Sequence, residues 1–189
     1  MRIALFGGTF DPIHNGHLEI ARDAARQFSL GRVWFVPASR PPHKTGVTNT
    51  PYEHRYRMVE LACQGEPLFE PSRLEQGEQN SYSIRTIERV RASLAAGDEL
   101  FFLIGADAFA EITTWHRWRD VIASVEFIVV SRPGRAYQVP EGARVQPLQG
   151  VDLPVSSSEI RRQLAAGDDP VDAPPAVLAY IREHDLYRQ

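Results

Sequence analysis

Short apolar runs alternate along this chain with segments of helical periodicity, and this alternation limits the possible folds more than any other feature of the sequence. The runs apolar enough for strands buried on both faces are Arg2–Phe6, Val33–Val36, Leu100–Ile104 and Phe127–Val130. Weaker strands are expected at Leu68–Leu74, where Pro71 disfavours a regular ladder, and at Ala143–Val145. Strands that alternate with helices predict an α/β fold, a doubly wound parallel sheet with helices on both faces.

The helices expected between these strands are marked by capping residues. They cover His17–Phe28, the segment after Thr50, Ile84–Ala96, Asp107–Ile112, Trp118–Ala123, Ser156–Gly167 and Pro174–Tyr187. Thr50 to Glu53 predicts a capping box with Pro51 at the first helical position, and Ser83 predicts an N-cap. Three glycines are expected to end helices, namely Gly31, Gly97 and Gly167.

Length and composition bound the class of protein. The 189 residues suit a single domain, 1–189, with a C-terminal helical part from about residue 157 that packs at one edge of the sheet. A net charge of −3 gives no general affinity for nucleic acid or acidic membranes. The one cysteine, Cys63, cannot form an internal disulfide, and no run of about 18 apolar residues is present. We therefore expect a cytoplasmic protein with no nucleic-acid or membrane partner; the oligomeric state stays open.

The segment from Gly7 to His17 joins the first strand to the first helix and carries the strongest functional signal. It matches neither the dinucleotide fingerprint nor the Walker phosphate loop. Gly7 and Gly8 allow the backbone to approach a phosphate, and the helix N-terminus adds its positive end. His14 and His17 are three residues apart, so both imidazoles lie on one helix face, where they can donate hydrogen bonds to phosphoryl oxygens.

Three other interpretations of this segment are open. The glycine pair is compatible with a simple tight turn, and a histidine at a helix start is often a surface residue. His14, His17 and Asp11 also have a spacing that a metal site can use. Found together at the end of the first strand, these features favour phosphate binding.

Residues 7–17 read Gly-Gly-Thr-Phe-Asp-Pro-Ile-His-Asn-Gly-His and resemble the N-terminal signature of the bacterial nicotinate-nucleotide adenylyltransferases, which belong to the nucleotidyltransferase superfamily with the H-x-G-H motif. The resemblance implies that His17 contacts the α-phosphate of ATP and that His14 contacts the neighbouring phosphates. It also implies ATP binding by the residues that precede them, namely Gly7, Gly8, Thr9 and Phe10.

Further segments resemble the family in the same order along the chain, up to about residue 165. Lys44, in Pro-Pro-His-Lys, is the only lysine among 21 Lys and Arg residues, and the resemblance implies that it reaches the phosphates. Taken alone, this segment is equally compatible with a stiff surface loop. Gly105 and Asp107, in Ile-Gly-Ala-Asp, are implied at the ribose or base, although Asp107 is also a plausible N-cap.

A second helix N-terminus resembles the family near residue 156. The segment Val-Ser-Ser-Ser-Glu-Ile-Arg departs from the family pattern by Val155 for Ile and by Ser158 for Thr, and the hydroxyl is retained. The resemblance implies that Arg161 binds the β- and γ-phosphates. It implies phosphate contacts for the serines as well, namely Ser156, Ser157 and Ser158. Ser156 and Glu159 also fit an ordinary capping box.

The acceptor site is implied by three more segments. Thr86, in Ser-Tyr-Ser-Ile-Arg-Thr, would hold a nicotinate carboxylate at a helix start, while Trp115 would stack on the pyridine ring. The backbone near His116 would meet the carboxylate, and Arg132 would face the mononucleotide phosphate. Trp118 is expected to serve packing. Donors on every side of the pocket would favour the acid over the amide.

The implied reaction joins nicotinate mononucleotide to the AMP part of ATP and releases pyrophosphate. Mg²⁺ is expected through the ATP phosphates, and no cluster of carboxylates marks a metal site of the protein itself. Two alternatives are a sister nucleotidyltransferase that acts on phosphopantetheine and a nucleotide-binding regulatory module without catalysis. Thr86 and Trp115 disfavour the first; His14, His17, Lys44 and Arg161 disfavour the second.

Overall fold

The computed structural model describes residues 1–39, 50–131, 136–150 and 154–188. Its centre is an all-parallel sheet with the strand order β3-β2-β1-β4-β5-β6. The strands are β1 Arg2–Gly8, β2 Arg32–Pro37, β3 Phe69–Pro71, β4 Glu99–Gly105, β5 Glu126–Val130 and β6 Arg144–Leu148. This order confirms the expected doubly wound sheet, and it reverses between β1 and β4, where such sheets bind ligands beyond the carboxyl ends of their strands.

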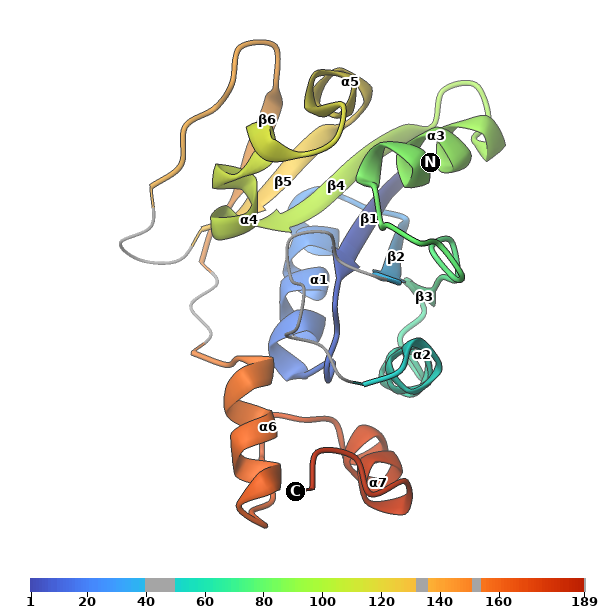
Figure 1. Ribbon diagram of the computed structural model, residues 1–189. Coiled ribbons are helices and arrows are strands. Elements are labelled where there is room, and N and C mark those ends of the chain that lie inside the picture. The colour runs from blue at the N-terminus through green and yellow to red at the C-terminus, as the bar shows by residue number, and fades with distance from the viewer. Residues whose placement is uncertain (40–49, 132–135, 151–153, 189) are drawn as a thin grey trace.

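Helices cover both faces of the sheet (Figure 1). One face carries α1 Asn15–Gln27 and α2 Tyr52–Ala62, and the helices α6 Ser157–Ala165 and α7 Pro175–Glu183 join the same core beyond the carboxyl end of β1. The other carries α3 Ser83–Ser93, α4 Ala106–Ala110, a 3₁₀ turn at Ile112–Thr114 and α5 Trp118–Ser124. Among the described residues, no helix combines the length and apolarity needed to cross a bilayer.

The two cores follow from the alternation of side chains along the buried strands. In β1, Ala4 and Phe6 pack under the first set of helices, while Ile3 and Leu5 pack under the second. All four side chains are buried, as a strand covered on both faces requires. The apolar run therefore sets both the position of β1 and its place at the centre of the sheet.

The two outermost strands differ most from the expected bounds. β3 covers only three residues and ends at Pro71, and β6 starts later than expected and contains Pro147. Proline has no N–H to give to a ladder, so it is tolerated at an edge strand with one neighbour. Both strands lie at the edges of the sheet, which explains why they tolerate proline.

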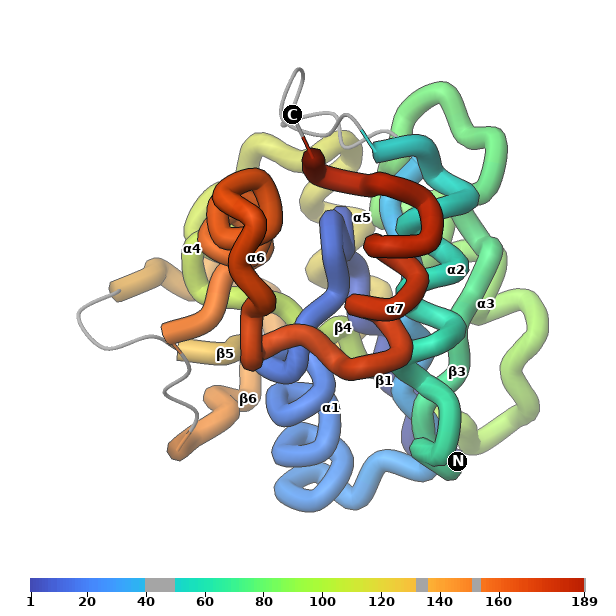
Figure 2. The backbone as a smooth tube through the Cα atoms, turned by 90° about the horizontal axis from the view of Figure 1, so that it is seen from below, coloured from blue at the N-terminus to red at the C-terminus, as the bar shows by residue number. Residues whose placement is uncertain are grey.

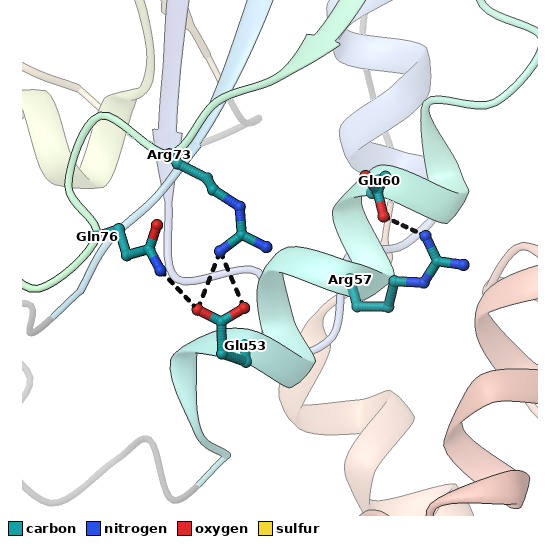
Figure 3. Close-up of polar contacts among 5 residues, drawn as sticks. All are labelled: Glu53, Arg57, Glu60, Arg73 and Gln76. Carbon is teal, nitrogen blue, oxygen red and sulfur yellow. Dashed lines mark hydrogen bonds and ion pairs between the residues drawn. The ribbon is translucent and has the colours of Figure 1, made fainter.

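The expected capping box at the start of α2 is wrong. Pro51 is the N-cap residue rather than the first helical residue, and neither it nor Thr50 caps the helix through a side chain. Glu53 instead accepts hydrogen bonds from Arg73, at 2.9 Å to each carboxylate oxygen, and from Gln76 (Figure 3). This arrangement ties α2 to the segment after β3.

Three expected helix boundaries are also wrong. Ser83 is the first residue of α3 and Tyr82 is the N-cap, without a side-chain cap. The helix ends at Ser93, so Gly97 (φ 91°) lies in the turn beyond it. α1 ends at Gln27, and Ser29 rather than Gly31 takes the left-handed conformation.

The C-terminal helices lie where β1 runs into α1, and Figure 2 shows them together across that end of the molecule. Gly167 ends α6 as expected: its φ is 85° and its N–H donates to Leu164 O at 3.1 Å. α7 ends earlier than expected, at Glu183. The chain then turns through left-handed Asp185 and Tyr187, which brings the C-terminal residues back toward the end of β1.

Candidate active site

The motif loop, residues 7–14, is shaped by the packing of one aromatic ring. Phe10 has a left-handed φ of 50°, and its buried ring packs 5.7 Å from the ring of Phe35 and 5.0 Å from that of His17. A side chain at Gly8 would come within 2.8 Å of the Phe10 ring, so this glycine makes room for Phe10. Phe10, predicted to bind ATP, can therefore reach a nucleotide only through its backbone.

The two motif histidines lie against each other at the start of α1. Their rings stack with centroids 3.7 Å apart, and His14 is the N-cap residue, 5% exposed. The His14 N–H donates to His17 Nδ1 at 3.3 Å. Because Nδ1 accepts this bond, the proton of a neutral His17 ring belongs on Nε2, which makes Nε2 a donor. The structure thus brings together the pair that the sequence placed on one helix face.

The N-terminus of α6 is bonded directly to the motif loop. Ser157 Oγ donates to Pro12 O at 2.9 Å, and the Arg161 guanidinium donates to Asp11 O at 2.7 Å. Ser156 caps α6 by accepting from the N–H of Glu159 at 3.2 Å. Two predicted phosphate-binding segments, about 145 residues apart in the chain, are therefore one structural unit, and Ser158 lies beside Arg161 at 3.3 Å.

Arg55 is a buried cation that the sequence analysis missed. It lies on the inner face of α2, is 2% exposed, and donates to Thr9 O and Ala38 O at 2.8 Å each. It also donates to Thr50 O at 3.1 Å and to Ser39 O at 3.3 Å. Burial lowers its pKa, which the charge of nearby Asp11 opposes. Arg55 therefore joins the motif loop to the end of β2 and to the start of α2.

Asp11 takes part in the same buried network. The hydroxyl of Tyr187 donates to Asp11 Oδ1, and burial together with this carboxylate raises the pKa of Tyr187. The C-terminal segment is thereby fixed to the motif loop. Asp11 was considered with the histidines as a possible metal site; across the described parts of the chain, no three His, Cys, Asp or Glu side chains form a group able to hold a metal ion.

A cavity of about 230 Å³ opens beside the motif loop, at the switch point of the sheet. Its walls come from the ends of β1, β2 and β4, from the segment before α3 and from the turn before α5. The lining residues are Gly7, Gly8, Thr9, Val36, Ala38, Glu75, Ser81, Tyr82, Ser83, Phe102, Ile104, Ala108, Glu111, Trp115 and His116.

Aromatic rings form one side of this cavity. The Trp115 ring meets Phe102 edge-on at 6.0 Å, and the His116 ring lies 4.4 Å from that of Tyr82. Trp118 does not line the cavity; it packs against the core beneath α3 and α5, with the Arg119 guanidinium 4.4 Å above its ring. Trp118 therefore serves packing, as expected, and Trp115 lines the cavity.

The polar groups of the cavity differ from the expectation. Thr86 is buried, does not line the cavity and donates its hydroxyl to Glu75 Oε1 at 2.8 Å. Glu75 does line the cavity, as does the exposed Glu111, so the expectation of donors on every side is wrong. Burial raises the pKa of Glu75, against hydrogen bonds from Ser81, Thr86 and the Ser39 N–H.

The remaining predicted residues lie at the end of β4 or outside the described residues. Gly105 is the N-cap of α4, and a side chain there would meet no protein atom within 4 Å, so internal packing does not require this glycine. Asp107 is exposed in the first turn of α4 and is not its N-cap. Lys44 and Arg132 lie outside the described residues.

Comparison with known proteins locates the chain among nucleotidyltransferases. Residues 5–163 match the cytidylyltransferase-like family model. The chain is 61% identical over 187 residues to the "Probable nicotinate-nucleotide adenylyltransferase" of Solibacter usitatus, covering 99% of this chain and 100% of the relative. It is 44% identical over 191 residues to the protein of the same name from Thermus thermophilus, with full coverage of both.

The fold is shared with a more distant enzyme of known structure. The nicotinic acid mononucleotide adenylyltransferase of Plasmodium falciparum, complexed with NaAD, is 19% identical with a TM-score of 0.79, over 98% of this chain and 97% of the other. This likeness supports the fold, and the sequence relatives support the family inferred from the motifs. The chain belongs to the nicotinate-nucleotide adenylyltransferase family.

Proposed function

We propose that this protein transfers the adenylyl group of ATP to nicotinate mononucleotide, giving deamido-NAD and pyrophosphate. The observation that carries the proposal is the junction of two helix N-termini beside an aromatic cavity. Arg161 and Ser157 of α6 bond to Asp11 O and Pro12 O, next to the stacked histidines of α1. Helix N-termini and fixed donors suit phosphates, and the Trp115 side of the cavity suits a pyridine ring.

The chemistry proposed here needs positioning and charge stabilisation. A phosphate oxygen of the mononucleotide attacks the α-phosphorus of ATP, the bond to the bridging oxygen breaks, and the electron pair leaves with pyrophosphate. His17 would donate from Nε2 to the α-phosphate, and His14, Lys44 and Arg161 would stabilise the charge on the other phosphates. The attacking phosphate is already an anion, so no general base is required.

The other predicted contacts complete the proposal. Gly7, Gly8, Thr9, Phe10 and the serines at 156–158 would contact ATP, and the open side of Gly105 leaves room for a ribose near Asp107. Trp115, His116 and Thr86 would hold the acceptor ring, with Thr86 acting through Glu75, which it bonds. Arg132 would bind the acceptor phosphate.

We propose that Mg²⁺ binds through the ATP phosphates and not at a metal site formed by protein side chains. When bound, it would neutralise part of the charge of the ATP phosphates. The donor set fits this arrangement, because Asp11, the carboxylate within the motif loop, is already bonded to the Tyr187 hydroxyl. We also propose that residues 1–189 form one functional domain, because Asp11 near one end of the chain and Tyr187 near the other meet in one hydrogen-bond network. A cytoplasmic location, without nucleic-acid partners, is part of the proposal.

The experiment is pyrophosphate release from ATP with a panel of acceptors. We expect release with nicotinate mononucleotide in a one-to-one ratio with a dinucleotide product. Release with phosphopantetheine in its place would support the sister nucleotidyltransferase. ATP binding without release for any acceptor would support the regulatory module.

A further inference from the structure

Glu75 is a buried carboxylate on the wall of the cavity beside Trp115, which we call the acceptor cavity. Contacts on the outer side of its segment fix its position. Arg73 and Gln76, which flank it in the chain, both bind Glu53 on α2 (Figure 3). Arg73 also stacks over the ring of Tyr56 at 3.7 Å. Glu75 itself is 8% exposed and lines the cavity. The segment is thus held on its outer side while Glu75 faces inward.

The hydroxyl groups near Glu75 form hydrogen bonds with its carboxylate. Thr86 donates to Oε1 at 2.8 Å, and Ser81 and the Ser39 N–H also hydrogen-bond to the carboxylate. A hydroxyl has one proton to donate. While Glu75 is ionised, it only accepts hydrogen bonds and offers no donor to an acid group in the cavity.

We propose that binding of the acid mononucleotide is coupled to uptake of one proton by Glu75, and that this coupling lets the cavity distinguish the ring carboxylate from the ring amide. The proposal rests on the proposed function, in that the acceptor ring occupies the cavity beside Trp115. The proton comes from solvent and stays on a Glu75 carboxylate oxygen. No covalent bond between heavy atoms changes.

The physical reason is that two carboxylates in one cavity disfavour each other's ionisation. The ring carboxylate keeps its charge, because the pyridinium nitrogen of the same ring stabilises it. Glu75 is the carboxylate that takes up the proton, since burial already raises its pKa. Once protonated, Glu75, which lines the cavity, can donate a hydrogen bond to the acid itself. An amide brings no charge and induces no such uptake.

The other ionisable groups near Glu75 are compatible with this assignment. Tyr52 on α2 interacts with Glu75 and stays neutral, because burial raises its pKa to about 12. Glu78, on the same segment, has its pKa lowered by Arg89 and keeps its charge, which disfavours a second charge on Glu75. The cavity lining also contains His116 and the exposed Glu111.

The test is calorimetry of mononucleotide binding to the whole protein at pH 7 and pH 8, with a non-hydrolysable ATP analogue present. Each titration is run in two buffers of different ionisation enthalpy, which reports the protons taken up. The amide is the control ligand because it carries the same ribose phosphate. We expect the acid to take up close to one proton more than the amide. Equal proton uptake by both ligands overturns the proposal.

Two variants identify the proton acceptor. Glu75→Gln removes the charge at nearly constant shape, and we expect it to abolish the difference in uptake between acid and amide. Glu60→Gln, which changes a partly exposed carboxylate of α2 outside the cavity lining, is expected to keep it. A difference that survives in a folded Glu75→Gln protein assigns the proton elsewhere. If that variant does not fold, the wild-type comparison of acid and amide still decides whether uptake occurs.

Failure of this inference can be told apart from failure of the proposed function. A protein that binds and adenylylates the acid without extra proton uptake refutes the role of Glu75 and leaves the function standing. Absence of binding heat and of turnover with the acid refutes the function itself.

Discussion

The motif loop and the acceptor cavity lie side by side, yet the protein builds them differently. The loop is held by polar bonds from distant segments: Arg55 of α2, Arg161 of α6 and Tyr187 near the C-terminus all bond to residues 9–11. The cavity is formed by aromatic and aliphatic side chains around the carboxylate of Glu75. A fixed polar frame suits a group that develops charge during the reaction, and an apolar wall suits selection of a ring.

The largest effect is expected at the motif loop. His17→Ala should lower kcat by about 10²–10³, because one preorganised donor is lost at the α-phosphate. The measurement is pyrophosphate release at saturating substrates, with circular dichroism to check the fold. His184→Ala, an exposed histidine after α7, is the matched control and should keep its rate. A folded His17→Ala protein with near-normal kcat would show that the motif loop does not stabilise the charge that develops during the reaction.

Arg55→Gln tests whether the loop depends on its polar frame. Backbone carbonyls of four residues lose a buried charged donor, so we expect the free energy of unfolding to fall by about 3 kcal/mol. The KM for ATP should rise more than the KM for the acceptor. Arg57→Gln is the control on the same helix, since its exposed pair with Glu60 (Figure 3) is worth less than about 1 kcal/mol. Equal losses from both variants, measured by urea unfolding, would contradict the account.

Tyr187→Phe removes one bond of the same frame. We expect a loss of about 1–2 kcal/mol, because the buried Asp11 loses a donor. The pH dependence has a definite sign. The folded protein raises the Tyr187 pKa above the ordinary value near 10, so unfolding releases this proton above that pH and stability falls as the pH rises. The variant should lose less stability than the wild type between pH 10 and pH 11, and parallel stability curves would argue against this environment for Tyr187.

The smallest effect is expected in the cavity. Trp115→Ala should raise the KM for nicotinate mononucleotide by about 3- to 10-fold, in line with the ~0.5–1.5 kcal/mol of an aromatic contact, and leave the KM for ATP nearly unchanged. Trp118→Ala should instead lower stability without this selective rise, since it packs outside the cavity. If steady-state kinetics with each substrate varied in turn show the reverse pattern, the ring lies elsewhere.

The same two regions explain what could be predicted from the sequence. The alternation of apolar runs identified the sheet, and the motif identified the loop, because Gly7, Gly8, His14 and His17 are close in sequence and act as a local unit. The junction with α6 was implied only through the family resemblance. Edge strands and helix caps were less predictable, because Pro71 and Ser83 depend on neighbours that local patterns do not contain.

The residues that were missed share one property. Arg55, Glu75 and Tyr187 are ionisable side chains whose partners are distant in the chain or whose burial depends on the whole fold. The chain has 20 arginines, because one of its 21 Lys and Arg residues is a lysine. No local sequence pattern distinguishes Arg55 from the arginines on the surface. Glu75 likewise lies in a segment rich in polar residues. Their roles follow from tertiary packing, which a single sequence does not display.

The most direct test of the account is competition between nicotinate mononucleotide and its amide at limiting enzyme, with both dinucleotide products quantified. The account predicts that the acid is favoured by at least about 10-fold in kcat/KM, or roughly 1.4 kcal/mol, because protonated Glu75 and the backbone near His116 would donate to a carboxylate that only accepts. One pyrophosphate should appear for each dinucleotide formed. Equal rates, or a preference for the amide, would contradict the assignment of the cavity to an acid-selective acceptor site.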